Sequence, residues 1–402
     1  MKDENQFEIL TDPELKPEVQ PGRPAGKTIV IHLLLFAVTF VSVSFMGVYF
    51  VGQAANAENF TDLVFWDGVL FAALLLGFLA VHEFGHYFAA ISHRVRTTLP
   101  YFIPLPYLSP IGTMGAVIRI KDRINDSKKL FDIGIAGPLA GFVVSLVILL
   151  VGFMNLPGPE FIQNFDNHEN LNNYIQQNNA FPDEPMSEND GVGMLMIGNT
   201  MLFDFMASFF EGVPPMWEMY HYPFLFAGWL GLFFTALNLM PVGQLDGGHI
   251  LYALIGYKKH LVFARLFFVV LVTLAGAGMV PLLHTIIELY DNPYATISWG
   301  IWAFTLFWMM RKAFHGNLFW ALTASVISLV CSGILIYGIF GPDGTSRFML
   351  WFFWSLLVLF FVGIEHPPVM NEQLLSPGRK VLGWLSILIF IVCISPNPFY
   401  LL

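Results

Sequence analysis

The chain has 402 residues, of which 56% are hydrophobic, 16% aromatic and only 12% charged, with a formal net charge of −10. Soluble domains carry about a quarter charged residues, so the composition excludes an ordinary soluble protein and favours a polytopic membrane protein. The two cysteines, Cys331 and Cys393, lie in apolar stretches, which excludes a disulfide framework and a cysteine metal site. We expect the lipid bilayer, and no nucleic acid, among its partners; the sequence indicates no oligomeric state.

Apolar stretches with roughly the 20 residues needed to cross a bilayer recur along the chain. They cover residues 28–51, 63–91, 131–154, 224–242, 261–287, 297–310, 318–340, 349–364 and 381–394. Because some of them are short, we predict an all-α polytopic membrane protein with eight or nine transmembrane helices.

The Lys and Arg residues predict how these helices are oriented, because loops rich in them stay in the cytoplasm. The N-terminus is therefore expected to be cytoplasmic and the C-terminus outside. Residues 1–27 have mixed charge and no apolar core, so we expect a flexible cytoplasmic tail and no signal peptide. An Arg/Ser-rich transit peptide is not evident either, which favours a bacterial inner membrane. Apart from Arg347, the basic residues cluster in the tail and in alternate loops, at Lys2, Lys16, Arg23, Lys27, Arg94, Arg96, Arg119, Lys121, Arg123, Lys128, Lys129, Lys258, Lys259, Arg265, Arg311, Lys312, Arg379 and Lys380.

One outside loop, residues 155–222, contains no Lys or Arg but many Asp and Glu residues. We interpret it as a solvated acidic loop on the non-cytoplasmic face; the alternative is an element that gates substrate access. Within it, residues 191–210 are more apolar and are expected to lie along the membrane surface.

A zinc-hydrolase pattern, His-Glu-Phe-Gly-His at residues 82–86, lies inside the apolar stretch 63–91. On a helix, His82 and His86 share one side about one turn apart, so both can bind one Zn²⁺ while Glu83 lies beside the water to be activated. Ionisable residues in a membrane helix are costly to bury and indicate function, although a polar contact between helices is the alternative. Arg94 follows His86 by roughly 12 Å of helix, so we expect a cavity open to the cytoplasm.

A catalytic zinc site needs a third ligand, and the second polar constellation at membrane depth offers one. The apolar helix before residue 241 breaks at Pro241 and is followed by Asp246 and two glycines. Asp246 is therefore the expected third ligand, or equally the N-cap of the next helix. We expect His249 to support the site or to pack rather than to bind metal. The histidines beside basic loops, His93, His260 and His315, are expected to be solvated.

Residues 82–86 together with residues 238–248 (NLMPVGQLDGG) resemble the site-2 protease family of intramembrane zinc metalloproteases. Residues 99–118 resemble the plastid and cyanobacterial branch of that family. Residues 136–141 (AGPLAG) resemble its small-residue segment, although close helix packing in lipid is the simpler explanation for them. The similarity covers about residues 63–257.

The resemblance implies that His82, His86 and Asp246 bind one Zn²⁺ per chain and that Glu83 is the general base. Asn238 would hold substrate or stabilise the oxyanion. The implied activity is that of a zinc metalloendopeptidase, a hydrolase that cleaves transmembrane segments of membrane-anchored protein substrates, usually after another protease has trimmed the ectodomain (regulated intramembrane proteolysis).

The segment 97–120 combines Pro-rich and Gly-containing turn signals with β-prone residues, which predicts a membrane re-entrant β-hairpin near the active site. Its edge could pair with an extended substrate, with Gly112 and Gly115 as substrate contacts. The alternative is a re-entrant loop with a purely structural role.

We therefore expect four regions. They are the cytoplasmic tail 1–27, the first transmembrane helix with a short outside loop at 28–62, a catalytic membrane core at 63–257 and additional C-terminal transmembrane helices at 258–402. Other functions remain open, namely a catalytically silent metal-binding scaffold of the same fold, an ion-coupled transporter that uses the broken helix, and a zinc protease acting on soluble peptides.

Overall fold

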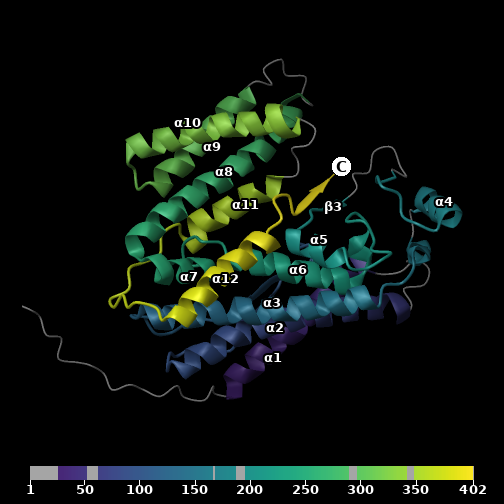
Figure 1. Ribbon diagram of the computed structural model, residues 1–402, viewed down its shortest axis with the longest axis horizontal. Helices are drawn as coiled ribbons and strands as arrows, with labels where there is room; N and C mark the ends of the chain where they lie inside the picture. Colours follow the sequence, from purple (N-terminus) through teal and green to yellow (C-terminus); the bar gives the residue numbers. More distant parts are fainter. Residues whose placement is uncertain are drawn as a thin grey trace, which may run out of the picture.

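The computed structural model describes residues 26–51, 62–165, 168–186, 195–288, 297–341 and 348–401, and these residues form a mostly helical fold (Figure 1). Nearly all of the predicted tail 1–27 lies outside the described residues, as do Arg347 and, in the acidic loop, Asp166, Glu188 and Asp190.

The elements follow the apolar stretches closely. The α-helices are α1 (Gly26–Val51), α2 (Asp62–Ser92), α3 (Ser127–Met154), α4 (Glu169–Asn178), α5 (Met201–Ala207), α6 (Pro223–Asn238), α7 (Asp246–Ile255), α8 (Tyr257–Glu288), α9 (Ile297–Ala313), α10 (Leu318–Gly333), α11 (Met349–Leu357) and α12 (Pro377–Cys393). Two short 3₁₀ helices, η1 (Pro159–Asn164) and η2 (Met219–His221), lie in the acidic loop, and π-helical turns, η3 (Ile334–Phe340) and η5 (Val358–Val362), extend α10 and α11. The strands are β1 (Tyr101–Pro104), β2 (Thr113–Val117), β3 (Leu195–Ile197) and β4 (Phe399–Leu401).

Five helical segments among the described residues are long and apolar enough to cross a membrane: 28–51, 65–92, 127–154, 257–288 and 318–340. Two further apolar helices, 223–238 and 349–362, are shorter. The structure therefore confirms a helical protein with several candidate membrane spans, and the count of eight or nine is not confirmed. Many large apolar side chains are exposed on the outer helices, including Leu33 on α1 and Val326 on α10, as expected for surfaces that face lipid.

Helices α1, α2, α3 and α6 pack into one layer, and α8 to α11 form a second layer beside it (Figure 1). Small residues allow the close approach of the backbones. A Cβ atom on Gly68 of α2 would stand 2.2 Å from the Ser44 carbonyl oxygen of α1, and one on Gly85 would stand 2.7 Å from the Ala136 carbonyl oxygen of α3. Helix α6 is buried along nearly its whole length, so it lies inside the protein rather than against lipid.

Segments that are distant in the sequence meet at the two ends of the helical layers. At one end, Gln373 donates a hydrogen bond to Asp126, the N-cap of α3. At the other end, β4 pairs in antiparallel register with β3 from the acidic loop. The described C-terminal residues thus lie beside the loop 155–222, at the right-hand side of Figure 1.

The C-terminal helices support the broken segment that carries Asp246. Trp354 of α11 donates a hydrogen bond to the Met240 sulfur. The N–H of Gly243 donates to the carbonyl of Ile364, just after η5. These contacts connect the region 258–402 directly to the core 63–257.

Three polar residues are less exposed to solvent than the sequence led us to expect. His260 was expected to be solvated but is fully buried, because the first turn of α8 packs against the rings of Tyr252 and His366. His93 is partly buried and bonds to Asp132. Within the acidic loop, Glu218 is only 2% exposed, so this part of the loop is folded inward.

Replacement of Gly243 by alanine tests the contact between the broken segment and the C-terminal helices. Gly243 has a φ of +55°, and its Cβ would lie 1.8 Å from the Gly363 carbonyl oxygen. Gly316 has a φ of +79° with open space around it, so Gly316→Ala introduces backbone strain alone. We expect Gly243→Ala to lower the free energy of unfolding by about 1–3 kcal/mol more than Gly316→Ala does, measured by thermal unfolding in detergent. Equal effects would contradict the close packing.

Candidate metal centre

Helix α2 brings His82, Glu83 and His86 into the interior of the helical layer. All three side chains are buried, with exposures of 2%, 7% and 6%. They lie in the second half of a helix whose other residues are nearly all apolar. The helical repeat puts His82 and His86 on the same face, with their Nε2 atoms 3.2 Å apart.

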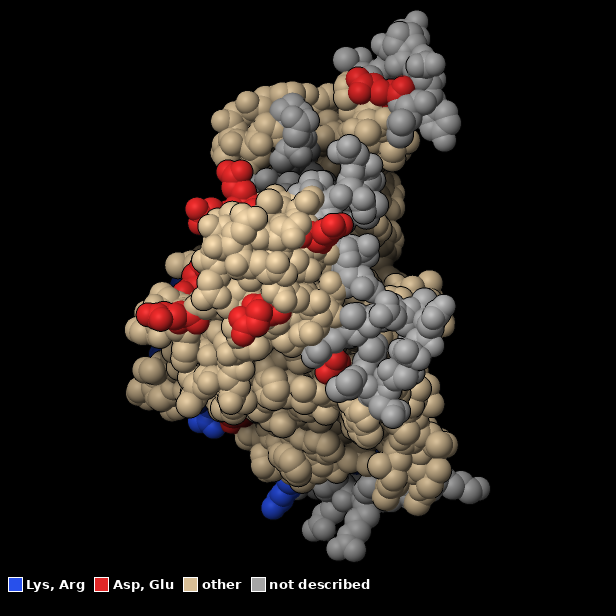
Figure 2. All heavy atoms as spheres, turned by 90° about the vertical axis from the view of Figure 1, so that its right-hand side faces the viewer, with Lys and Arg blue, Asp and Glu red and all other residues tan. Residues whose placement is uncertain are grey.

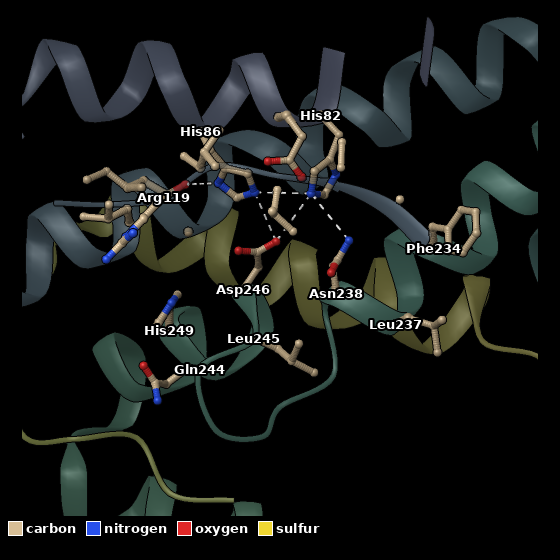
Figure 3. A pocket seen from close by; sticks show the side chains of 18 of the residues that line it. His82, His86, Arg119, Phe234, Leu237, Asn238, Gln244, Leu245, Asp246 and His249 are labelled. Carbon is tan, nitrogen blue, oxygen red and sulfur yellow. Dashed lines mark hydrogen bonds and ion pairs between the residues drawn. The ribbon is translucent and has the colours of Figure 1, made fainter. Parts of the chain in front are cut away.

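Asp246 reaches the two histidines from the opposite side (Figure 3). It is the first residue of α7, and Leu245 occupies the N-cap position. The alternative that Asp246 caps this helix is therefore wrong. Glycine at 247 and 248 lets the start of α7 fold back, because Cβ atoms there would lie 2.0 Å from the Leu239 carbonyl oxygen and 2.3 Å from that of Gly243.

The three candidate ligand atoms are spaced as a tetrahedral zinc site requires. Asp246 Oδ2 lies 3.6 Å from His82 Nε2 and 3.2 Å from His86 Nε2, and the two nitrogens are 3.2 Å apart. Zinc–nitrogen bonds of about 2.0–2.1 Å in a tetrahedron separate neighbouring ligand atoms by roughly 3.3 Å. The three residues therefore fit zinc at three corners, with the fourth left for water or substrate.

The hydrogen bonds of His86 favour metal binding. Its Nδ1 lies 2.7 Å from the carbonyl oxygen of Ile133 on α3, so Nδ1 carries the proton and donates it. In the neutral ring the Nε2 lone pair then points toward His82 and Asp246. Two imidazole nitrogens and a carboxylate oxygen that converge in this way need a proton or a cation between them.

The AGPLAG segment of α3 provides the space for both imidazoles. A Cβ atom at Gly137 would lie 2.1 Å from His86 Nε2, and one at Gly141 would lie 3.1 Å from His82 Nδ1. The simpler explanation from the sequence, close helix packing, is therefore incomplete, because Gly137 and Gly141 contact the two candidate ligands themselves.

The predicted hairpin is present as an antiparallel pair, with Tyr101 opposite Val117 and Phe102 opposite Ala116. Its second strand lines a cavity of ≈ 790 Å³ that also contains Glu83 and the three candidate ligands. Ile118, directly after β2, lines the same cavity as Glu83. The hairpin thus lies at the site, while its depth in a bilayer stays a prediction.

The remaining predicted residues differ in their distance from the centre. Asn238 ends α6, and its Nδ2 lies 3.5 Å from His82 Nε2 (Figure 3). Gly115 lines the cavity, whereas Gly112 is not among its lining residues and packs against α1, where its carbonyl accepts a hydrogen bond from Ser42. His249 lines the cavity and bonds to His366, which agrees with a supporting role.

Several residues of the site carried no recognisable sequence signal. The Ile133 carbonyl that orients His86 is a backbone group, which residue type cannot reveal. Trp354 lines the cavity from α11, far outside the region of family resemblance. Gln244 and Tyr101 also line it. Of these, only Gln244, inside the 238–248 motif, and Tyr101, inside the predicted hairpin 97–120, had positions that could have suggested them.

Comparison with known proteins identifies curated relatives of this chain. The chain is 28% identical over 276 residues to the probable chloroplastic zinc metalloprotease EGY1 of Arabidopsis thaliana, covering 64% of this chain and 45% of the relative. It is 30% identical over 262 residues to EGY1 of Oryza sativa subsp. japonica (60% and 41%), and 29% identical over 192 residues to the probable chloroplastic zinc metalloprotease EGY2 of Oryza sativa subsp. indica (48% and 30%).

The chain spans less than half the length of these curated relatives. No solved structure gives a significant match. The sequence profile described as Peptidase family M50 matches residues 70–275, just over half of the chain, and this range includes both motifs of the metal centre. The chain therefore belongs to peptidase family M50.

Proposed function

We propose that the protein is an intramembrane zinc metalloendopeptidase that hydrolyses peptide bonds in or near transmembrane segments of membrane-anchored proteins. The observation that carries this proposal is the tetrahedral spacing of His82, His86 and Asp246. The two histidines and Glu83 lie on α2, which is long and apolar enough to span a membrane, and Asp246 meets them from α7. The names of the relatives, probable zinc metalloproteases, support the reaction class.

The residues around the metal centre have distinct proposed roles. His82, His86 and Asp246 would hold Zn²⁺, which when bound lowers the pKa of water and polarises the scissile carbonyl. Glu83, next to His82 in the chain and buried in the same cavity, takes a proton from the attacking water and later passes it to the leaving amine. Asn238, at the edge of the ligand cluster, donates a hydrogen bond to the substrate carbonyl as it becomes an oxyanion.

The hairpin offers a way to hold an unwound substrate. Strand β2 pairs with β1 on one side and lines the cavity. An extended peptide that added to β2 would keep its backbone hydrogen-bonded where lipid supplies no partners. In this proposal Gly115, which lacks a side chain at the cavity wall, contacts substrate, and Gly112 holds the hairpin turn on α1.

The proposed orientation puts the loop 155–222 and strand β4 outside and the metal centre toward the cytoplasm. The face that carries this loop and β4 shows scattered acidic residues, with basic residues only near its lower left edge (Figure 2). A cytoplasmic end rich in Lys and Arg is the expected arrangement. The relatives are chloroplastic by name, which gives no support to the expected bacterial inner membrane, so the identity of the membrane stays a prediction.

Loss of Asp246 tests the metal centre. We expect Asp246→Ala to contain about one zinc less per chain than the wild type after dialysis, because two histidines alone do not hold the ion tightly. Inductively coupled plasma mass spectrometry of both proteins measures the difference. Equal zinc contents, which a transporter without tightly bound zinc at this centre would also give, would show that Asp246 does not hold a zinc ion.

Loss of Glu83 separates an enzyme from a silent scaffold. Glu83→Gln keeps a similar shape but removes the base, so we expect it to retain zinc and to cleave about 10²–10⁴-fold more slowly. The assay uses a reconstituted model substrate with one transmembrane segment, and a soluble peptide of the same sequence is the comparison. Cleavage at the wild-type rate by Glu83→Gln would contradict the proposed mechanism; faster cleavage of the soluble peptide would contradict the proposed substrate class.

Replacement of Gly137 by alanine tests the packing of α3 against the ligands. Because its Cβ would occupy the place of the His86 ring, we expect zinc affinity to fall by at least about 10–100-fold. Gly77→Ala is the matched control, since it lies on α2 with no atom near its Cβ. Competition with a chelator measures both affinities, and an unchanged affinity in Gly137→Ala would refute the contact.

A further inference from the structure

A second group of metal-binding side chains lies in the acidic loop. It comprises His168, just before α4, together with Glu218 and His221 at η2. One potential ligand atom from each residue lies within 4.8 Å of the others. His168 Nε2 is 3.1 Å from Glu218 Oε2, and His221 Nε2 is 3.6 Å from the same oxygen. These two distances resemble those at the first centre.

Glu218 and His221 are buried, His168 is partly buried, and His221 is incompletely bonded. Glu218 is 2% exposed and His221 is 6% exposed. The Nδ1 of His221 lies 2.8 Å from the carbonyl oxygen of Phe50, near the end of α1, and therefore donates a proton to it. Its Nε2 faces Glu218 and has no hydrogen-bond partner among the described residues. A buried nitrogen without a partner is rare in folded proteins unless an ion or water fills the space.

The chemistry of the surroundings favours a cation at this point. Residues 155–222 contain no Lys or Arg, and both His168 and His221 face the carboxylate of Glu218. The ring of Phe165 packs against His221, with centroids 3.9 Å apart. An imidazole nitrogen that faces a carboxylate can offer its lone pair to a metal ion bound between them.

We propose that His168, Glu218 and His221 bind a second zinc ion, which has a structural role. Two imidazoles and one carboxylate suit zinc better than calcium or magnesium, which prefer oxygen ligands. The ion would tie three parts of the protein together: the segment before α4, the turn η2 and, through the His221–Phe50 hydrogen bond, the end of α1. It would thereby hold the acidic loop against the outer ends of the membrane helices.

Zinc analysis of four full-length proteins tests this proposal: the wild type, Asp246→Ala, His221→Gln and the double variant. We expect Asp246→Ala to retain about one zinc per chain after dialysis, and the double variant to retain none. His284→Gln is the matched control, because His284 forms an exposed pair with Glu288 and should change nothing. If Asp246→Ala cannot be loaded with zinc, the proposal is overturned.

The comparison keeps the two sites separate. The zinc lost on changing Asp246 reports the catalytic centre, and the zinc lost on changing His221 reports the site in the loop. If His221→Gln does not fold, cobalt replaces zinc in Asp246→Ala, where d–d absorption bands of a nitrogen- and oxygen-ligated ion are expected. Absence of these bands, or a thermal unfolding midpoint of Asp246→Ala that a chelator leaves unchanged, would overturn the second site and indicate a His168–Glu218 ion pair instead.

Discussion

The carboxylate of Asp246 faces two imidazoles inside an apolar helical bundle, where its side chain is only 17% exposed. Such a charge is tolerated only beside a group that compensates it. The surrounding elements must therefore keep the three ligand atoms about 3.3 Å from one another, as a tetrahedral zinc site requires. Helix α2 sets the spacing of the two histidines, α3 orients His86 through the Ile133 carbonyl, and the break after α6 delivers the aspartate. The architecture of the core follows from this requirement.

The same requirement explains why small residues concentrate at the contact of α2 with α3. In lipid, glycines commonly allow helix backbones to approach. Here Gly137 and Gly141 lie directly over the imidazoles, so their lack of side chains determines where the histidines can point. Beyond the core, α11 and the turn after η5 form hydrogen bonds with the 238–248 segment through Trp354 and Ile364. The C-terminal helices therefore contribute to the site without carrying a motif of their own.

The local patterns in the sequence predicted that His82, His86 and Asp246 would come together, because they stand in short motifs with a helical repeat or a helix break. The number of spans was harder to predict, since hydropathy cannot separate a helix facing lipid from one enclosed by protein, as α6 is. The contact of Gly137 with His86 could not be predicted from the sequence, because it depends on how α3 packs against α2. The cluster of His168, Glu218 and His221 depends on a loop without periodicity that brings together residues about 50 positions apart.

The pairing of β4 with β3 has a consequence for biogenesis. Strand β3 emerges from the ribosome well before α8 to α12, but its partner is made only after all of them. The β3–β4 ladder can therefore form only after α12 and the residues that follow it have been synthesised. Until then the edge of β3 that pairs with β4 stays uncovered, which exposes this stage of synthesis to misassembly.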